Sequence, residues 1–76
     1  MVKVTTEDES IRRMVEGSIE TFLSGKQNQN WIIGTIRESG INKEALKKLF
    51  SEAYKRHLGN LQLLELEKAC KQMGFL

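Results

Sequence analysis

The residue types best suited to catalysis are scarce in this chain. It has one histidine, His57, and one cysteine, Cys70. A closed zinc site needs four ligands, so we expect no metal, and a lone cysteine excludes an intramolecular disulfide. A catalytic triad needs a nucleophile, a base and a group that orients the base, and no glycine-rich phosphate loop is present. We therefore expect a protein that binds and is not an enzyme, without a cofactor, in which His57 is a surface residue and Cys70 a small buried hydrophobe.

Basic side chains gather in one segment of the chain. Residues 43–57 hold five of them against two acidic ones, a net charge of +3, whereas the whole chain carries +2. The five are Lys43, Lys47, Lys48, Lys55 and Arg56. Clustering of this kind is typical of surfaces that bind the phosphates of nucleic acids. The alternative is an ordinary solvated helix face, because exposed lysines are common.

The length and composition indicate one small folded domain, residues 1–76. Hydrophobic residues make up 39% of the chain and charged residues 29%, which suits a folded domain. A domain of this size has a small core and gains stability from oligomerisation when it lacks disulfides and metals, so a homodimer is expected. The longest apolar run is Trp31–Ile33, far short of the roughly 20 residues of a membrane helix, and no signal peptide is expected. We expect an intracellular protein, cytoplasmic or nucleoid-associated, with a host nucleus left open.

Glycines and asparagines mark the ends of the helical segments. The chain has no proline, and Gly25, Gly40, Gly59 and Gly74 each follow a run with helical spacing, where glycine readily adopts the left-handed conformation. These stops predict helices at about 7–24 and about 30–39, a third that follows Asn42 and can reach Leu58, and a last one between Asn60 and Gly74. The residues suited to cap their N-termini are Thr6, Asn30, Asn42 and Asn60. A weak strand pattern occurs only at residues 2–4.

Apolar residues recur at helical spacing and predict the core. The fold class expected is all-α, a compact bundle of four helices with a central helix-turn-helix. The residues expected on the buried faces are Ile11, Met14, Val15, Ile19, Phe22 and Leu23 in the first helix, Trp31, Ile32, Ile33 and Ile36 in the second, Ala45, Leu46, Leu49, Phe50, Ala53 and Tyr54 in the third, and Leu63, Leu64, Leu66, Ala69, Cys70 and Met73 in the last.

The segment from Trp31 to Gly59 has the order helix, short turn, capped helix. A helix-turn-helix joins two helices by a turn of three or four residues that often contains glycine, and here Gly40 supplies that turn. Ile41 and Leu46 have the spacing of a hydrophobic staple around the Asn42 cap. The positions expected to point outward from the second helix are Asn42, Lys43, Glu44, Lys47 and Lys48.

The stretch "IRESGINKEALKKLF", followed by "LGNLQLLELEKACKQMGFL", resembles the helix-turn-helix domain of the phage-repressor and Cro family over residues 31–76. Gly40, Ile41, Asn42, Leu46 and Leu49 match the family's turn glycine, apolar corner, polar cap and inner positions. The chain departs from the family at Ile32, where a glutamine is usual, and at Thr35 and Ile36, where an apolar residue and alanine are usual. It also departs in the helical spacing that continues towards Leu58, where the family has an irregular loop.

The resemblance implies a small transcriptional regulator whose third helix enters the major groove of double-stranded DNA. Asn42, Lys43, Glu44 and Lys47 would approach base edges or phosphates, and Lys48, Lys55 and Arg56 would hold backbone phosphates. Two alternatives remain open. One is a helical protein–protein interaction module, an adaptor or inhibitor that binds no nucleic acid, and the other is an assembly subunit.

Overall fold

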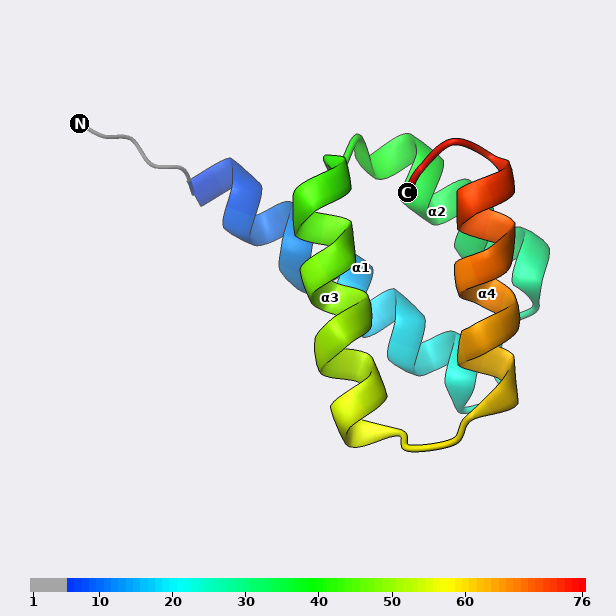
Figure 1. Cartoon of the computed structure of the whole chain (residues 1–76). Coiled ribbons are helices and arrows are strands. Elements are labelled where there is room, and N and C mark those ends of the chain that lie inside the picture. The colour runs from blue at the N-terminus through cyan, green and yellow to red at the C-terminus, as the bar shows by residue number, and fades with distance from the viewer. Residues whose placement is uncertain (1–5) are drawn as a thin grey trace. The chain divides into compact units, whose positions relative to one another are not determined.

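The computed structural model describes the backbone of residues 6–76 and the side chains from residue 9 onward. Residues 6–76 form four α-helices and no strand: α1 (Thr6–Leu23), α2 (Gln29–Ser39), α3 (Lys43–Arg56) and α4 (Leu61–Gln72) (Figure 1). The predicted all-α class is confirmed. The expected cap by the Thr6 side chain and the strand pattern at residues 2–4 lie outside the described residues.

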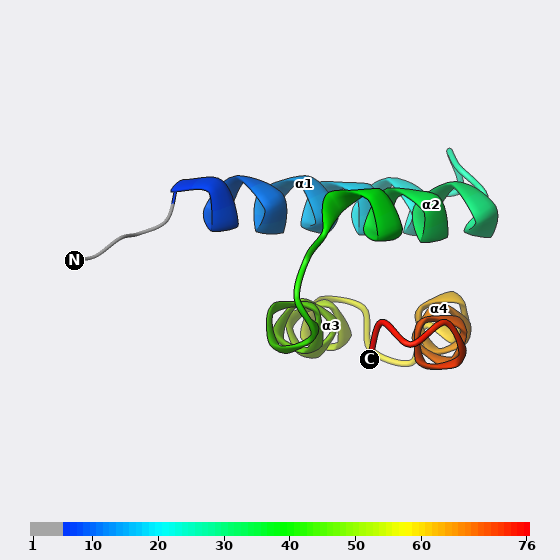
Figure 2. The same cartoon turned by 90° about the horizontal axis from the view of Figure 1, so that it is seen from above.

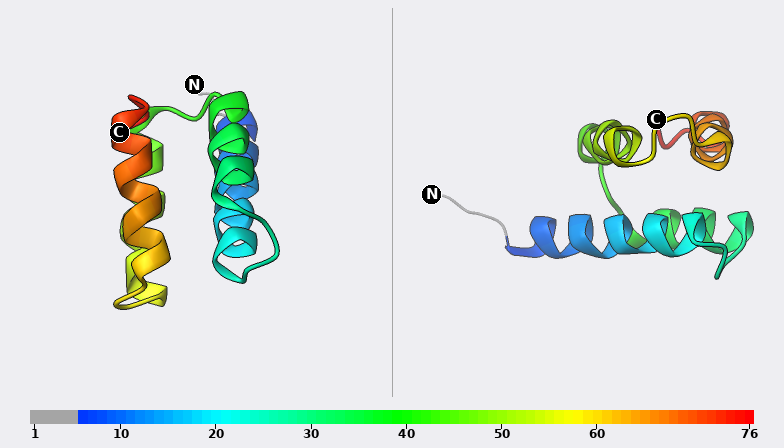
Figure 3. Two further views of the ribbon diagram at one scale, coloured as in Figure 1. Left: turned by 90° about the vertical axis from the view of Figure 1, so that its right-hand side faces the viewer. Right: turned by 90° about the horizontal axis from the view of Figure 1, so that it is seen from below.

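The chain divides into two compact units, each built on a pair of helices. The first unit ends at Ile41 and the second runs from Asn42 to Leu76. In the first unit α1 and α2 contact each other and run in opposite directions (Figures 2 and 3). In the second unit α3 and α4 form an antiparallel hairpin (Figure 1).

The start of α2 differs from the prediction. Asn28 is the N-cap, with an extended backbone, and its side-chain oxygen accepts a hydrogen bond from the Trp31 backbone N–H at 2.8 Å. The prediction that Asn30 is the cap is wrong because the helix already begins at Gln29. Both asparagines follow a polar loop, so their residue type does not separate them.

The asparagine caps predicted for α3 and α4 are confirmed. The Asn42 side chain accepts from the Ala45 N–H at 2.8 Å, and the Asn60 side chain accepts from the Leu63 N–H at 3.2 Å. Each bond satisfies one of the backbone donors that the first turn of a helix leaves without a partner.

The end of α4 shows why glycine was expected there. Gly74 has a φ of +87°, and all four glycines expected after helix ends have positive φ. The Phe75 N–H donates to the Cys70 carbonyl at 2.8 Å, and the Gly74 N–H donates to the Lys71 carbonyl at 3.2 Å. This pair of bonds is the Schellman motif, as the sequence predicts.

α3 ends earlier than the helical spacing of the sequence would permit. The helix stops at Arg56, and His57 is the C-cap with φ −128° and ψ 67°. The His57 N–H still donates to the Ala53 carbonyl at 2.8 Å, and the Asn60 N–H then donates to the His57 carbonyl at 3.3 Å. The possible extension to Leu58 is therefore wrong, because the chain leaves the helical conformation at His57.

Most of the predicted core residues are buried. In the described residues the buried apolar side chains are Val15, Ile19, Phe22, Ile32, Ile33, Ile36, Leu46, Leu49, Phe50, Ala53, Leu63, Leu66 and Cys70. Three expected members are exposed: Met14 at 47%, Leu64 at 42% and Met73 at 50%. Met14 and Leu64 each adjoin a fully buried residue in sequence, which places them about 100° around the helix and outside the buried stripe.

Candidate nucleic-acid surface on α3

All seven residues predicted to contact DNA are exposed and belong to one continuous segment. Asn42 caps α3 and the other six lie within it. The seven are Asn42, Lys43, Glu44, Lys47, Lys48, Lys55 and Arg56. The distance from Lys43 to Lys55 along the axis is about 18 Å at a rise of about 1.5 Å per residue. The segment therefore presents two groups of polar side chains, one at each end of α3.

The opposite side of α3 holds the helix in place. Leu46, Leu49, Phe50 and Ala53 recur at steps of three and four residues and are at most 2% exposed. Such spacing puts all four on one face. The basic face is thus turned to solvent, which a groove-binding helix requires.

The turn that precedes α3 has the local conformation that the sequence predicts. Gly40 ends α2 with a φ of +71°, in the left-handed region that disfavours other residues. The Ser39 hydroxyl donates to the Ile36 carbonyl at 2.7 Å and accepts from the Ile41 N–H at 3.1 Å. These bonds satisfy backbone groups at the turn.

The charges on α3 are mixed. Glu44 lies in the first turn, and Lys55 and Arg56 lie in the last turn, positions at which the helix dipole stabilises these signs of charge. Glu44, Lys48 and Glu52 follow one another at intervals of four residues, so carboxylates flank Lys48 along the helix surface. Part of the charge pattern therefore also stabilises the helix itself.

Asn42 has a structural role that the sequence also predicts. Because its side-chain oxygen accepts the Ala45 N–H, that oxygen is already engaged at the helix start. The side-chain amide N–H groups remain the donors that Asn42 can offer to a phosphate or base.

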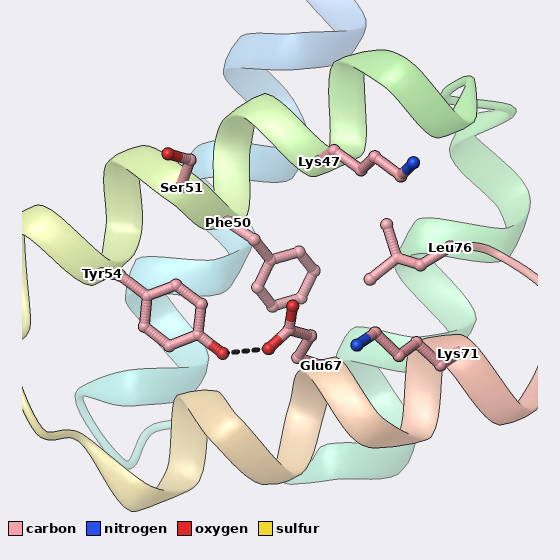
Figure 4. Close-up of a pocket in the computed structure, with 7 residues that line it drawn as sticks. All are labelled: Lys47, Phe50, Ser51, Tyr54, Glu67, Lys71 and Leu76. Carbon is pink, nitrogen blue, oxygen red and sulfur yellow. Dashed lines mark hydrogen bonds between the residues drawn. The ribbon is translucent and has the colours of Figure 1, made fainter.

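A second feature, which the sequence did not indicate, lies between α3 and α4. A cleft of about 670 Å³ lies within the second unit (Figure 4). Its lining residues are Lys47, Phe50, Ser51, Tyr54, Glu67, Lys71 and Leu76. Lys47 is thus a member of both the predicted DNA surface and the cleft. Spacing within one helix cannot show which residues of the other helix lie opposite, so this site could not be predicted from the sequence.

The Tyr54 hydroxyl donates a hydrogen bond to a carboxylate oxygen of Glu67 across this cleft (Figure 4). Burial raises the pKa of Tyr54 above its ordinary value of 10.0, and the hydrogen bond to Glu67 and the negative charge of Glu67 raise it further. The phenol therefore remains protonated at neutral pH and serves as a donor. The bond joins the last turn of α3 to the middle of α4.

Cys70 and His57 offer no reactive pair. Cys70 is a free cysteine with 0% exposure, and burial, followed by the charge of Glu67, raises the pKa of its thiol to about 11. The thiolate is the nucleophilic form, so this thiol is unreactive at neutral pH. His57 lies at the C-cap of α3, half-buried.

In the part of the chain that the structure describes, no helix is both long enough and apolar enough to cross a membrane. From residue 9 onward, no three His, Cys, Asp or Glu side chains are grouped so that they could hold a metal ion.

Comparison with protein-family models, with characterised proteins and with solved structures finds no match for this chain. The resemblance to the phage-repressor and Cro family therefore rests on the residues quoted above, and the pairing of α2 with α3 as a helix-turn-helix stays a prediction.

Proposed function

We propose that this protein binds double-stranded DNA through the polar face of α3 and acts inside the cell as a small transcriptional regulator. The observation that carries the proposal is the exposure of all seven predicted contact residues on a helix whose other face is buried. Five of the seven are cations, and cationic side chains supply most of the affinity for the phosphate backbone.

The two ends of α3 have different roles in this proposal. The N-terminal part of a recognition helix reaches the base edges, which assigns base contacts to Lys43, Glu44 and Lys47. Lysine can donate to guanine and a glutamate can accept from the amino group of cytosine. Lys55 and Arg56, about three turns further along, bind phosphates and fix the orientation.

The test reverses two charges that lie outside the α3–α4 cleft. Lys48→Glu with Lys55→Glu should weaken binding to a fluorescently labelled mixed-sequence duplex by about tenfold or more, because two phosphate contacts become repulsive. Fluorescence anisotropy at low salt measures the affinity, and circular dichroism checks that the helices persist.

The matched control is Lys26→Glu with Lys68→Glu, which changes the net charge equally at two exposed lysines outside α3. The control variant should retain most of the affinity. Unchanged binding in the α3 variant would contradict the proposal. Equal losses in the two variants would also contradict it, because they would show attraction by net charge alone.

A second candidate function is protein–protein interaction, which three leucines of the second unit favour. Leu58 is 86% exposed, Leu61 72% and Leu64 42%, and a contiguous exposed apolar patch, if these side chains form one, is typical of an interaction surface. The occupant would be a second copy of the chain, giving the homodimer, or another protein. Sedimentation of the native chain and of Leu58→Ser with Leu61→Ser distinguishes these cases, since only a homodimer dissociates in the variant.

A further inference from the structure

The α3–α4 cleft has the size of a small-molecule site. Its volume of about 670 Å³ falls within the range of roughly 300–1,000 Å³ found for ligand pockets. All its lining residues belong to the second unit, on α3, on α4 and at Leu76. The cleft is therefore a property of the helical hairpin alone.

The interior of the cleft is apolar. The Phe50 ring lies at its centre (Figure 4) and is 2% exposed. The Tyr54 ring and the half-buried Leu76 side chain border it on either side. Because Phe50 is itself covered, the half-buried Tyr54 ring and Leu76 side chain offer an apolar body the surface from which water is displaced.

The rim of the cleft is cationic. Lys47 extends from α3 and Lys71 from α4, and both side chains project into the space beside Leu76 (Figure 4). The one carboxylate side chain in the lining, that of Glu67, already accepts the Tyr54 hydroxyl. Two ammonium groups facing the same space repel a cation and attract an anion.

We propose that this cleft binds a small organic anion with an apolar body. Its acidic group lies near the ammonium groups of Lys47 and Lys71, and its body lies against the Tyr54 ring and the Leu76 side chain. Charge complementarity at the rim sets the preference for an anion, and the apolar groups favour an anion that carries a hydrocarbon body.

The experiment uses dodecanoate, a carboxylate on a hydrocarbon chain, and follows the backbone amide NMR signals of the whole native chain. The expected result is a saturable shift of the signals of Ser51, Tyr54, Lys71 and Leu76. Dodecyltrimethylammonium, which has the same hydrocarbon body and the opposite charge, should bind at least about tenfold more weakly.

Two double variants with the same charge change locate the acidic group. Lys47→Gln with Lys71→Gln should weaken dodecanoate binding by about tenfold, because both ammonium groups of the rim are removed. The matched control is Lys48→Gln with Lys68→Gln, on the same two helices but outside the lining. This control should bind as the native chain does.

Three results would overturn the assignment. They are shifts centred on the exposed Leu58 and Leu61 instead of the cleft, equal weakening in both double variants, and equal binding of the cationic and anionic probes. The experiment contains no DNA, and the DNA test changes lysines outside the cleft, so failure of one proposal is distinguishable from failure of the other.

Discussion

Asn28 and Asn30 differ by one hydrogen bond at the start of α2. Asn28 accepts the Trp31 N–H at 2.8 Å, whereas Asn30 is an exposed residue within the first turn. Asn28→Ala should lower the free energy of unfolding by about 1 kcal/mol, the usual cost of losing an N-cap. Asn30→Ala should change it by less than about 0.5 kcal/mol. Urea denaturation followed by circular dichroism measures both, and equal effects would contradict the assignment of the cap.

The buried thiol of Cys70 makes stability depend on pH in the alkaline range. Its pKa is raised from 9.0 to about 11, first by burial and then by the charge of Glu67. Above pH 9 the unfolded chain loses this proton while the folded chain keeps it, so the folded state is progressively disfavoured. The contribution of the protonated Cys70 thiol to the free energy of unfolding is fully present below pH 9 and is lost by about pH 11.

The free energy of unfolding should therefore fall as the pH rises from 9 to 10, by about 1 kcal/mol. The measurement is urea denaturation at several pH values, on the native chain and on Cys70→Ala. The variant should show a flatter profile in this window, because lysines and tyrosine titrate mainly above it. The same steep fall in both proteins would show that another group is responsible.

Gly34 lies within α2 and Gly40 follows its end. Substitution by alanine should change the stability of the chain in opposite directions at these two positions. A Cβ at Gly34 would meet no atom within 4 Å, so Gly34→Ala should stabilise the chain by about 0.5–1 kcal/mol through helix propensity. Gly40 has a φ of +71°, and Gly40→Ala should destabilise it by about 1 kcal/mol or more. Thermal unfolding of the two variants tests the pair, and a loss of stability at Gly34 would show that the glycine is required there.

The elements could be predicted from the sequence where their causes are local. The Asn42 and Asn60 caps and the Gly74–Phe75 ending depend on residues within a few positions of one another, and these predictions are confirmed. The type and number of helices follow from the same local signals. The exposure of the basic side chains of α3 could be predicted because they lie at helix positions outside its apolar stripe.

Features that depend on neighbours in space could not be predicted. No local pattern indicates that Tyr54 pairs with Glu67, because the two residues are 13 positions apart and belong to different helices. The exposure of Leu64, next to the fully buried Leu63, depends on how much of α4 the facing helix covers. The choice of Asn28 over Asn30 depends on where the preceding loop lets the helix begin. The cleft lies between the helices that carry Tyr54 and Glu67, and it could not be predicted for the same reason as their hydrogen bond.

At the scale of the whole molecule, the distribution of charge matters more for DNA binding than its total. Residues 1–25 carry three basic and five acidic side chains, whereas residues 43–57 carry five basic and two acidic ones. A net charge of +2 gives weak attraction to DNA at a distance, so the proposed function requires direct contacts between α3 and DNA. Direct contacts release counterions from DNA in proportion to the phosphates neutralised.

The salt dependence of binding therefore measures how many of the five cations of α3 contact phosphate. If all five do so, a plot of log affinity against log salt concentration has a slope of about −4.5, at about 0.9 for each contact. Lys48→Glu with Lys55→Glu should reduce the steepness of that slope by about 2, because two contacts are lost. Anisotropy titrations from low to physiological salt give both slopes. An unchanged slope in the variant would mean that these two lysines touch no phosphate, and a slope near zero in the native chain would contradict binding through the cations of α3.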